Sequence, residues 1–130
     1  MLTYLYIAIG SALGGMARYW CMVTANHYLG NLFPWGTVIV NVLGSFVVGF
    51  VAALAISEKI PLSLNTQRFL MVGVCGGYTT FSTFSLDTLK LLQNDEYLKA
   101  GANMTVSVFL CLGAVFFGYF VASMITQLKT

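Results

Sequence analysis

Charged residues are scarce in this sequence. Of its 130 residues only 8% are Asp, Glu, Lys or Arg, whereas 58% are hydrophobic, and the mean hydropathy is +0.85. A soluble domain carries about a quarter charged residues, so the composition excludes an ordinary soluble protein. Because a membrane-spanning helix needs roughly 20 apolar residues, the chain has room for four spans and short loops. It has no room for a separate soluble catalytic domain.

Acidic side chains are missing from the middle of every long apolar stretch. The four of them lie in polar segments or near the end of a stretch, at Glu58, Asp87, Asp95 and Glu96. Transport coupled to protons or cations commonly uses a buried carboxylate, so this distribution argues against such a transporter. Asp87 lies three residues before Lys90, and this spacing predicts a solvated or interfacial ion pair.

Metal-ligating and catalytic clusters are also missing from the sequence. The three cysteines form no CxxC pair and lie in apolar segments, as small packing residues do: Cys21, Cys75 and Cys111. The single histidine, His27, has no second ligand beside it. Since no pair of carboxylates and no Ser-His-Asp set is visible either, we do not expect an enzyme.

The long apolar stretches predict four transmembrane helices in one domain that covers residues 1–130. Their expected ranges are 2–24, 36–56, 67–93 and 100–127, with polar loops at 25–34, 57–66 and 94–99. The first stretch lacks a basic leader and has the full length of a span, so we expect a retained helix rather than a cleaved signal peptide. The predicted fold class is therefore all-α and integral to a membrane.

The segment GVCGGYTTFSTFS at 73–85 interrupts the third of these stretches with a pair of glycines and, from Thr79 to Thr83, four hydroxyl side chains. Each glycine costs a helix about 1 kcal/mol relative to alanine, and β-branched threonines follow the pair. We therefore expect two half-helices joined at Gly76–Thr80, a break that a bilayer tolerates only where protein, water or an ion satisfies the backbone. The alternative is a packing kink, with Phe81 and Phe84 as core residues.

Polar side chains form stripes along two other predicted spans. Thr37, Asn41 and Ser45 follow one another at intervals of four residues, which places them on one helical face. The fourth span repeats the pattern with Asn103, Ser107 and Cys111. An amide in hydrocarbon must find a partner, so these stripes either hold helices together or line a polar pathway.

Arg18 is the one basic residue well inside a predicted span. Charges within a membrane are costly and usually face a cavity or a partner, which makes Arg18 a candidate for the vestibule of a pore, where it would concentrate anions. In the alternative interpretation it snorkels to the interface beside Tyr19 and Trp20. Neutral donors with one arginine favour a pathway for a small anion over one for a cation.

Basic residues are balanced between the two expected sides of the membrane. With four spans, the termini and the 57–66 loop share one side, which holds Lys59, Arg68 and Lys129. The other side holds Lys90, Lys99 and, in the snorkelling interpretation, Arg18. Orientation normally follows an excess of Lys and Arg on the cytoplasmic side. The balance therefore predicts insertion in both orientations, and an antiparallel homodimer with its two-fold axis in the membrane plane.

Three segments of the chain resemble the signature segments of the Fluc (CrcB-type) fluoride channels. They are GGMARYW at 14–20, PWGTVIVNVLGSFVVG at 34–49 and GVCGGYTTFSTFS at 73–85. The resemblance covers the first three spans in order, and the fourth matches only through Asn103 and Ser107. It implies a dual-topology antiparallel dimer with two pores, which passively exports fluoride across a bacterial-type plasma (inner) membrane and so lowers cytoplasmic fluoride.

The resemblance also assigns roles to residues by their position in these motifs. The implied fluoride contacts are the rings of Phe81 and Phe84, the amide of Asn41 and the hydroxyls of Thr83 and Ser107. A single central Na⁺ would be bound by backbone carbonyls of Gly76 and Thr79 from both subunits. Such residues suit fluoride, because amide and hydroxyl groups donate hydrogen bonds and the edges of aromatic rings are positive.

Two alternative functions fit a small four-span protein. A small multidrug-type exporter needs a buried carboxylate in its first span, and residues 2–24 contain no acidic residue. A non-transporting assembly subunit would need only the glycine-rich faces, which would leave the stripe of Thr37, Asn41 and Ser45 without a role. Measurement of ion flux in liposomes distinguishes these alternatives from a channel.

Overall fold

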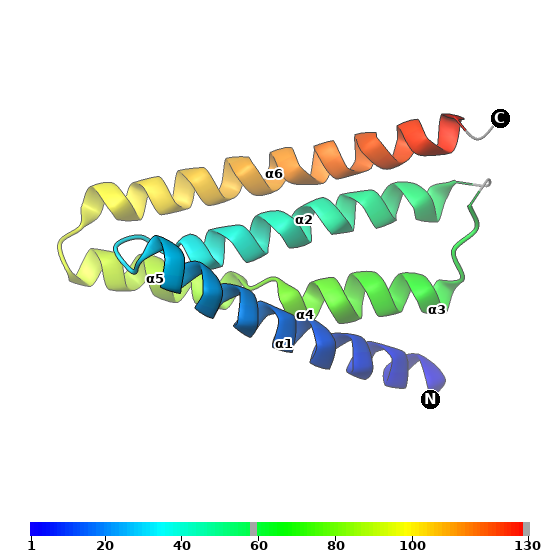
Figure 1. Ribbon diagram of the computed structural model, residues 1–130, viewed down its shortest axis with the longest axis horizontal. Helices are drawn as coiled ribbons and strands as arrows, with labels where there is room; N and C mark the ends of the chain where they lie inside the picture. The colour runs from blue at the N-terminus through cyan, green and yellow to red at the C-terminus, as the bar shows by residue number, and fades with distance from the viewer. Residues whose placement is uncertain (58–59, 129–130) are drawn as a thin grey trace.

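The computed structural model of the protein describes residues 1–57 and 60–128. The regular structure within these ranges is entirely helical (Figure 1). In chain order the elements are α1 (Leu2–Leu29), α2 (Trp35–Ile56), α3 (Leu64–Gln67), the π-helical η1 (Arg68–Cys75), α4 (Gly76–Tyr78), α5 (Phe81–Gln93) and α6 (Tyr97–Leu128).

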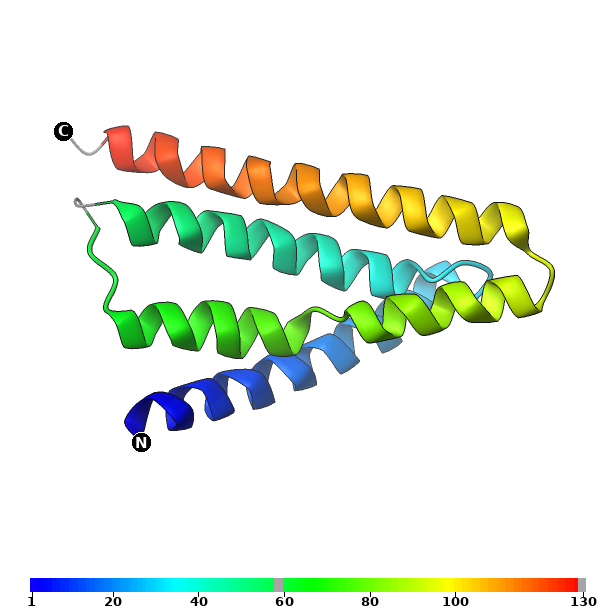
Figure 2. The ribbon, with the colours of Figure 1, turned by 180° about the vertical axis from the view of Figure 1, so that it is seen from behind.

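The helices form an elongated bundle in which the chain crosses from end to end four times (Figures 1 and 2). α2 and α6 lie side by side and run in the same direction, and the rod made of α3, η1, α4 and α5 runs the opposite way. α1 lies obliquely along this rod. The N-terminus, the α2–α3 connection and the end of α6 share one end of the bundle, as the charge analysis assumed.

Three of the crossings are apolar and long enough to span a membrane. They are α2, the rod Leu64–Gln93, and α6. α1 has 28 residues, which is ample length, but tyrosines, glycines and Arg18 lower its mean hydropathy and it does not reach the same apolarity. The predicted all-α membrane fold is therefore supported by three apolar helices, to which α1 adds a more polar fourth crossing.

Two predicted helix boundaries need correction, because local capping overrides the hydropathy pattern. α1 extends to Leu29, into the predicted 25–34 loop, and stops where Gly30 adopts a φ of 76° that glycine takes without strain. α3 starts at Leu64, inside the predicted 57–66 loop, where the Ser63 side chain accepts a hydrogen bond from Thr66 N at 3.1 Å. Glu58 and Lys59 of that loop, and Lys129, lie outside the described residues.

The interruption of the third crossing is confirmed, but it is shorter than predicted. Gly76 has helical angles (φ −63°, ψ −37°), and only Thr79 and Thr80 are extended. The adjacent glycine serves packing instead, because a Cβ on Gly77 would lie 2.5 Å from Ser11 O of α1. The break therefore falls on the β-branched residues, which favour extended backbone.

Glycines also allow a close helix contact between α2 and α6. A Cβ added to Gly49 of α2 would collide with the backbone of Val115, and one added to Gly118 of α6 with the carbonyl of Phe46. Small residues let helix backbones approach in a membrane, where packing rather than the hydrophobic effect holds helices together. This contact fixes the register between the two helices that carry the polar stripes.

We expect Gly118→Ala to destabilise the protein by about 1–3 kcal/mol, because the added methyl group overpacks the α2–α6 contact. Gly113→Ala is the matched control on the same helix, since a Cβ there meets nothing within 4 Å. Thermal unfolding in detergent micelles measures both. Equal melting temperatures for the two variants would contradict this account of the contact.

Candidate functional site

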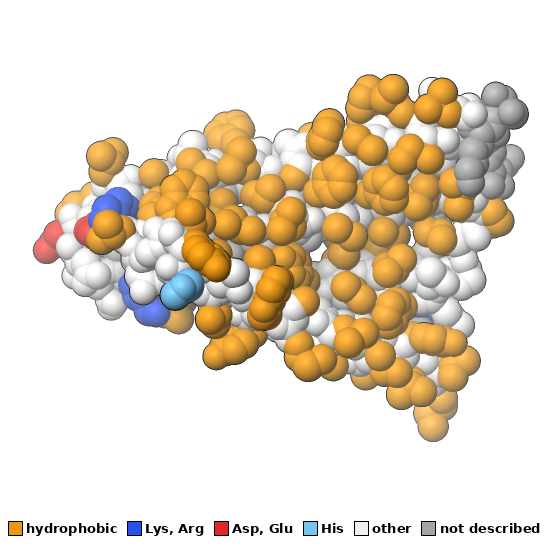
Figure 3. All heavy atoms as spheres, in the orientation of Figure 1, with side chains coloured by type: hydrophobic (Ala, Val, Ile, Leu, Met, Phe, Trp, Pro, Cys, Tyr) orange, Lys and Arg blue, Asp and Glu red, His pale blue; other side chains and the backbone are white. Residues whose placement is uncertain are grey.

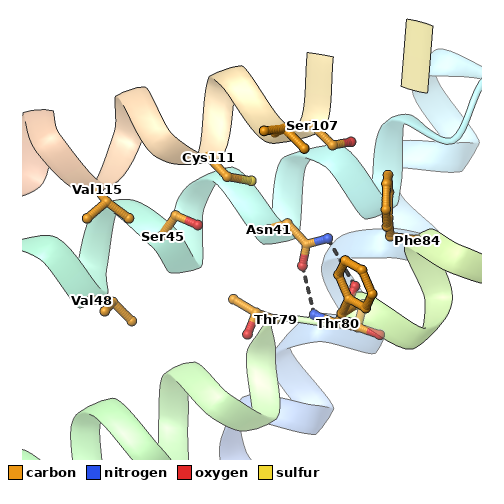
Figure 4. Close-up of a pocket in the computed structure, with 11 residues that line it drawn as sticks. Asn41, Ser45, Val48, Thr79, Thr80, Phe84, Ser107, Cys111 and Val115 are labelled. Carbon is orange, nitrogen blue, oxygen red and sulfur yellow. Dashed lines mark hydrogen bonds between the residues drawn. The ribbon is translucent and has the colours of Figure 1, made fainter. Parts of the chain in front are cut away.

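The break between α4 and α5 is held by one side chain of α2. Asn41 Nδ2 donates to Thr80 O at 3.0 Å, and Thr80 N donates to Asn41 Oδ1 at 2.7 Å (Figure 4). A carboxamide carries a donor and an acceptor side by side, so it satisfies both backbone groups of an extended residue that has no strand partner. In hydrocarbon each unsatisfied group would cost several kcal/mol. Asn41 thus makes the break tolerable.

Thr80 in turn starts α5 and sets the direction of its first turn. Its side chain is buried, accepts a hydrogen bond from Thr83 N at 3.1 Å and donates to Thr83 Oγ1 at 2.8 Å. This is an N-terminal helix cap, which satisfies one of the free N–H groups of a first turn. Because the cap orients that turn, it also places Phe81 and Phe84.

The rings of Phe81 and Phe84 contact each other at the start of α5. Their centroids are 5.3 Å apart and their planes are tilted by 43°. Phe84 is half-buried, whereas Phe81 is 78% exposed. The pair therefore extends from the inside of the bundle to an exposed face of the chain.

These residues border a cavity of about 320 Å³ between α2, the break and α6 (Figure 4). Four of the five predicted fluoride contacts and one predicted sodium ligand line it: Asn41, Phe81, Phe84, Ser107 and Thr79. The remaining wall is mostly apolar and is made by Ser45, Val48, Thr80, Val108, Cys111 and Val115. The fold thus brings together side chains from three separate parts of the sequence.

Three predicted site residues do not line this cavity, namely Thr83, Gly76 and Arg18. Thr83 lies one position before Phe84 and has its hydroxyl bonded to Thr80. Gly76 is exposed at the C-terminal end of η1, and a Cβ on it would meet only Met71 O, at 3.8 Å. Gly76 therefore faces open space rather than a neighbouring helix of the same chain.

Arg18 of α1 lies at the break, not at a helix end. Its Nη1 donates to Thr79 O at 3.2 Å. Because α1 continues to Leu29, Arg18 is eleven residues, or ~16 Å, from the end of the helix. Its guanidinium binds backbone in the middle of the bundle, which is the partner-facing alternative rather than the snorkelling one.

The three side chains of the Thr37–Asn41–Ser45 stripe lie in two different environments. Asn41 and Ser45 face the cavity, whereas the buried Thr37 donates from Oγ1 to Asp87 Oδ2 at 2.6 Å. The predicted ion pair of Asp87 with Lys90 is wrong, since the one ion pair among the described residues joins Lys99 to Glu96 at 2.7 Å. The packing of α5 on α2 offers Asp87 a closer partner than its own helix does.

A second group of polar side chains, which the sequence analysis did not connect, links α5 to α6. Asn103 is fully buried and donates to Thr88 Oγ1 at 2.9 Å, and Thr88 donates to Phe84 O at 2.9 Å. Ser107 Oγ donates to Asn103 Oδ1 over a long 3.4 Å. The stripe on α6 pointed to Asn103, but nothing in the sequence indicated Thr88 as its partner.

A second cavity of about 320 Å³ lies at the end of the bundle that holds the α1–α2 and α5–α6 loops. Polar and charged side chains make much of its wall, namely Asn26, Asn31, Thr37, Asp87, Lys90, Asn94 and Glu96. On the face shown in Figure 3 the charged side chains gather at this end, and the middle of the bundle is covered by hydrophobic ones. Thr37 and Asp87 line this cavity but not the first.

The backbone around the break can be tested for its fit to a sodium ion. Within residues 1–57 and 60–128 no group of three or more His, Cys, Asp or Glu side chains could hold a metal, so carbonyl oxygens are the relevant ligands. In a continuous helix Thr80 N would bond to Gly76 O, but here it donates to Asn41, which releases that carbonyl. Neutral oxygens suit hard cations, and one chain offers those of Gly76 and Thr79.

Known proteins similar to this chain were found by sequence comparison. Residues 5–119 match the family described as CrcB-like protein, Camphor Resistance (CrcB). A protein of Methylocella silvestris is 48% identical over 127 residues, or 97% of both chains. One of Opitutus terrae is 47% identical over 131 residues, or 99% of this chain and 98% of its own. One of Paramagnetospirillum magneticum is 44% identical over 128 residues, or 98% and 100%. Each is named fluoride-specific ion channel FluC.

We expect Asn41→Leu to destabilise the break, because it removes the partners of Thr80 N and Thr80 O at a cost of about 1–3 kcal/mol for each buried group. Hydrogen exchange followed by mass spectrometry should show faster exchange in peptides that contain Thr80. Ser45→Ala is the control, since Ser45 lies one turn further along the same cavity wall. Unchanged protection at Thr80 in the Asn41 variant would rule out the amide as the support of the break.

Proposed function

The chain belongs to the CrcB-like protein family, and we propose that the cavity between α2, α6 and the helix break is its pathway for fluoride. The expectation of a fluoride channel, and not an enzyme, is confirmed by relatives of that name that match nearly the whole chain. The alternatives of a multidrug-type exporter and of a non-transporting subunit find no support in this membership. The channel carries its ion passively, and by export it lowers fluoride in the cytoplasm.

The observation that carries the pathway is the convergence of donors and aromatic edges on one cavity. Fluoride is a compact acceptor that must exchange its water for other donors. Asn41 Nδ2 has two N–H groups and gives one to Thr80 O, so the second can serve the ion. The 3.4 Å bond of Ser107 is weak for a hydroxyl, and this donor can turn toward the cavity.

The aromatic and hydroxyl residues of α5 complete this pathway. The edges of Phe81 and Phe84 are positive, and rings tilted by 43° can present an edge to an anion while excluding bulk water. Thr83 accepts from Thr80 and keeps its own proton for donation beside the rings. Arg18, bound to Thr79 on the cavity wall, raises the local concentration of anions.

In the membrane, α1 acts as the fourth span beside the three apolar crossings. Its 28 residues reach ~42 Å, more than the roughly 30 Å hydrocarbon core requires. Its polar Arg18 is satisfied within the protein by Thr79 O, so lipid need not solvate it. The protein is thus a multi-pass protein of a bacterial-type plasma (inner) membrane, with both termini on one side.

An antiparallel homodimer supplies the wall that one protomer lacks. Phe81 is 78% exposed although it borders the cavity, so the chain alone does not enclose the pathway. Gly76 is exposed close to it in sequence. A second copy inserted upside down would cover both residues and would create two equivalent pores. The even distribution of basic residues supports insertion in both orientations.

A central sodium ion fits the same dimer. The released carbonyl of Gly76 and that of Thr79 give two hard oxygen ligands from one chain, and a two-fold axis would double them. Hard cations take several oxygen ligands, so the site depends on assembly. When bound, the ion supplies positive charge that offsets the carbonyl dipoles exposed by the break.

The pathway predicts that Phe81→Ile and Phe84→Ile abolish most fluoride flux in dimers that still assemble. Isoleucine retains bulk but has no positive ring edge, and a barrier raised by 1.4 kcal/mol slows passage about tenfold. Fluoride efflux from proteoliposomes, recorded with a fluoride electrode, should fall at least about tenfold for either variant. Chloride efflux is the control for leakage.

The matched control is Phe116→Ile, an exposed phenylalanine of α6 away from the cavity lining. It should conduct at nearly the wild-type rate. Size-exclusion chromatography establishes that each variant is dimeric before flux is compared. Wild-type flux in dimeric Phe81→Ile and Phe84→Ile would contradict the proposed contact with fluoride and would leave both rings with a packing role only.

Insertion in both orientations is testable with single cysteines at opposite ends of the bundle, in a chain without the three native ones. Pro61→Cys and Asn94→Cys are exposed positions at the two ends. If the chain inserts in both orientations, an impermeant thiol reagent added to intact cells should label about half of the Pro61→Cys molecules and about half of the Asn94→Cys molecules. Full labelling of one position and none of the other would exclude dual topology.

A further inference from the structure

Arg18 and the proposed sodium ion claim the same oxygen atom. Arg18 Nη1 lies 3.2 Å from Thr79 O, and Thr79 O is one of the two carbonyls that each chain would offer to the ion. The following inference rests on the proposed sodium site, and it concerns what occupies that carbonyl when sodium does not.

Within residues 1–57 and 60–128, Arg18 has no partner of opposite charge. Among the described residues the one ion pair joins Lys99 and Glu96, so no carboxylate neutralises the guanidinium. A charge in this setting is costly unless a partner meets it, and the partner here is a backbone dipole at the break. Conversely, Thr79 is extended, and its carbonyl takes the arginine as a hydrogen-bond donor.

We propose that Arg18 is an internal competitor of the central cation, and that it sets the sodium concentration at which the dimer is stabilised. Without sodium, the guanidinium caps Thr79 O and satisfies the break. When sodium binds, its positive charge repels the guanidinium at short range in a medium of low dielectric, so Arg18 must withdraw from this oxygen. Because a two-fold axis brings two copies of Arg18 to one ion, the competition acts from both subunits.

A purely structural role would have a different consequence. If Arg18 only tied α1 to the break, its loss would weaken the protein equally with and without sodium. If Arg18 instead competes with sodium, its loss weakens the sodium-free form alone, so that the protein's stability responds more strongly to sodium. The sodium dependence of stability therefore separates the two roles, whether or not the variant conducts.

Arg18→Gln tests the proposal, because glutamine keeps a hydrogen-bond donor and removes the charge. The thermal stability of the dimer in detergent is measured as sodium replaces N-methyl-D-glucamine at constant ionic strength. The half-saturating sodium concentration should fall roughly tenfold, within the usual range of coupling between sites. Arg18→Lys retains the charge and should stay near wild type. Arg68→Gln is the charge control, since exposed Arg68 bonds to Thr3 Oγ1, at 3.4 Å, and to no other side chain in the part of the chain that the structure describes.

An unchanged or increased sodium requirement in Arg18→Gln would overturn the competition. A wild-type protein whose stability ignores sodium would overturn it as well, together with the sodium site. Fluoride efflux measured on the same preparation tests the proposed pathway separately, so a failure of the channel function would be recognised on its own.

A measurement on the wild type covers the case in which Arg18→Gln yields no dimer. The chain has only two arginines, Arg18 and Arg68, so ¹⁵N solid-state spectra of labelled arginine contain one test signal and one reference. Sodium should shift the side-chain resonances of Arg18 and leave those of Arg68 in place. Two unshifted sets of resonances would contradict the proposal.

Discussion

The pair of hydrogen bonds between the Asn41 carboxamide and the backbone of Thr80 is the constraint on which the rest of the site depends. A chain that interrupts its helix within a bilayer must satisfy the exposed N–H and C=O groups internally. One amide does this for both groups of Thr80, at 2.7 and 3.0 Å. Without it, the N–H and C=O groups of Thr80 would lose these partners, at a cost of several kcal/mol for each group in hydrocarbon.

Two helices stabilise the break, and the side chain that each of them contributes can also interact with an anion. α2 contributes Asn41, which still has one N–H to offer, and α1 contributes Arg18, whose charge rests on Thr79 O. These contacts place a donor and a positive charge beside the same short stretch of extended backbone. The groups that stabilise the interruption are thus the ones that can attract an anion.

Beyond the break, buried polar groups continue toward the loop end of the bundle in two hydrogen-bonded sets. One joins Thr37 to Asp87, and the other joins Ser107, Asn103 and Thr88. Satisfied networks of this kind cost little stability and hold helices in a unique register. Ser107 of one set lines the cavity beside the rings, and Thr37 and Asp87 of the other line the charged cavity.

By itself, the sequence determined the membrane class, the range of α2 within one residue, the family and five of the residues that line the cavity beside the break. Composition and periodicity report these properties, because they depend on each segment's own side chains. Only the tertiary structure decided that the break lies at Thr79 and Thr80, that Arg18 binds Thr79 O, and that Thr37 bonds to Asp87 instead of lining the cavity with Asn41 and Ser45. The physical reason is that periodicity defines the face of a helix on which a residue lies, whereas its partner depends on which backbone packs opposite that face.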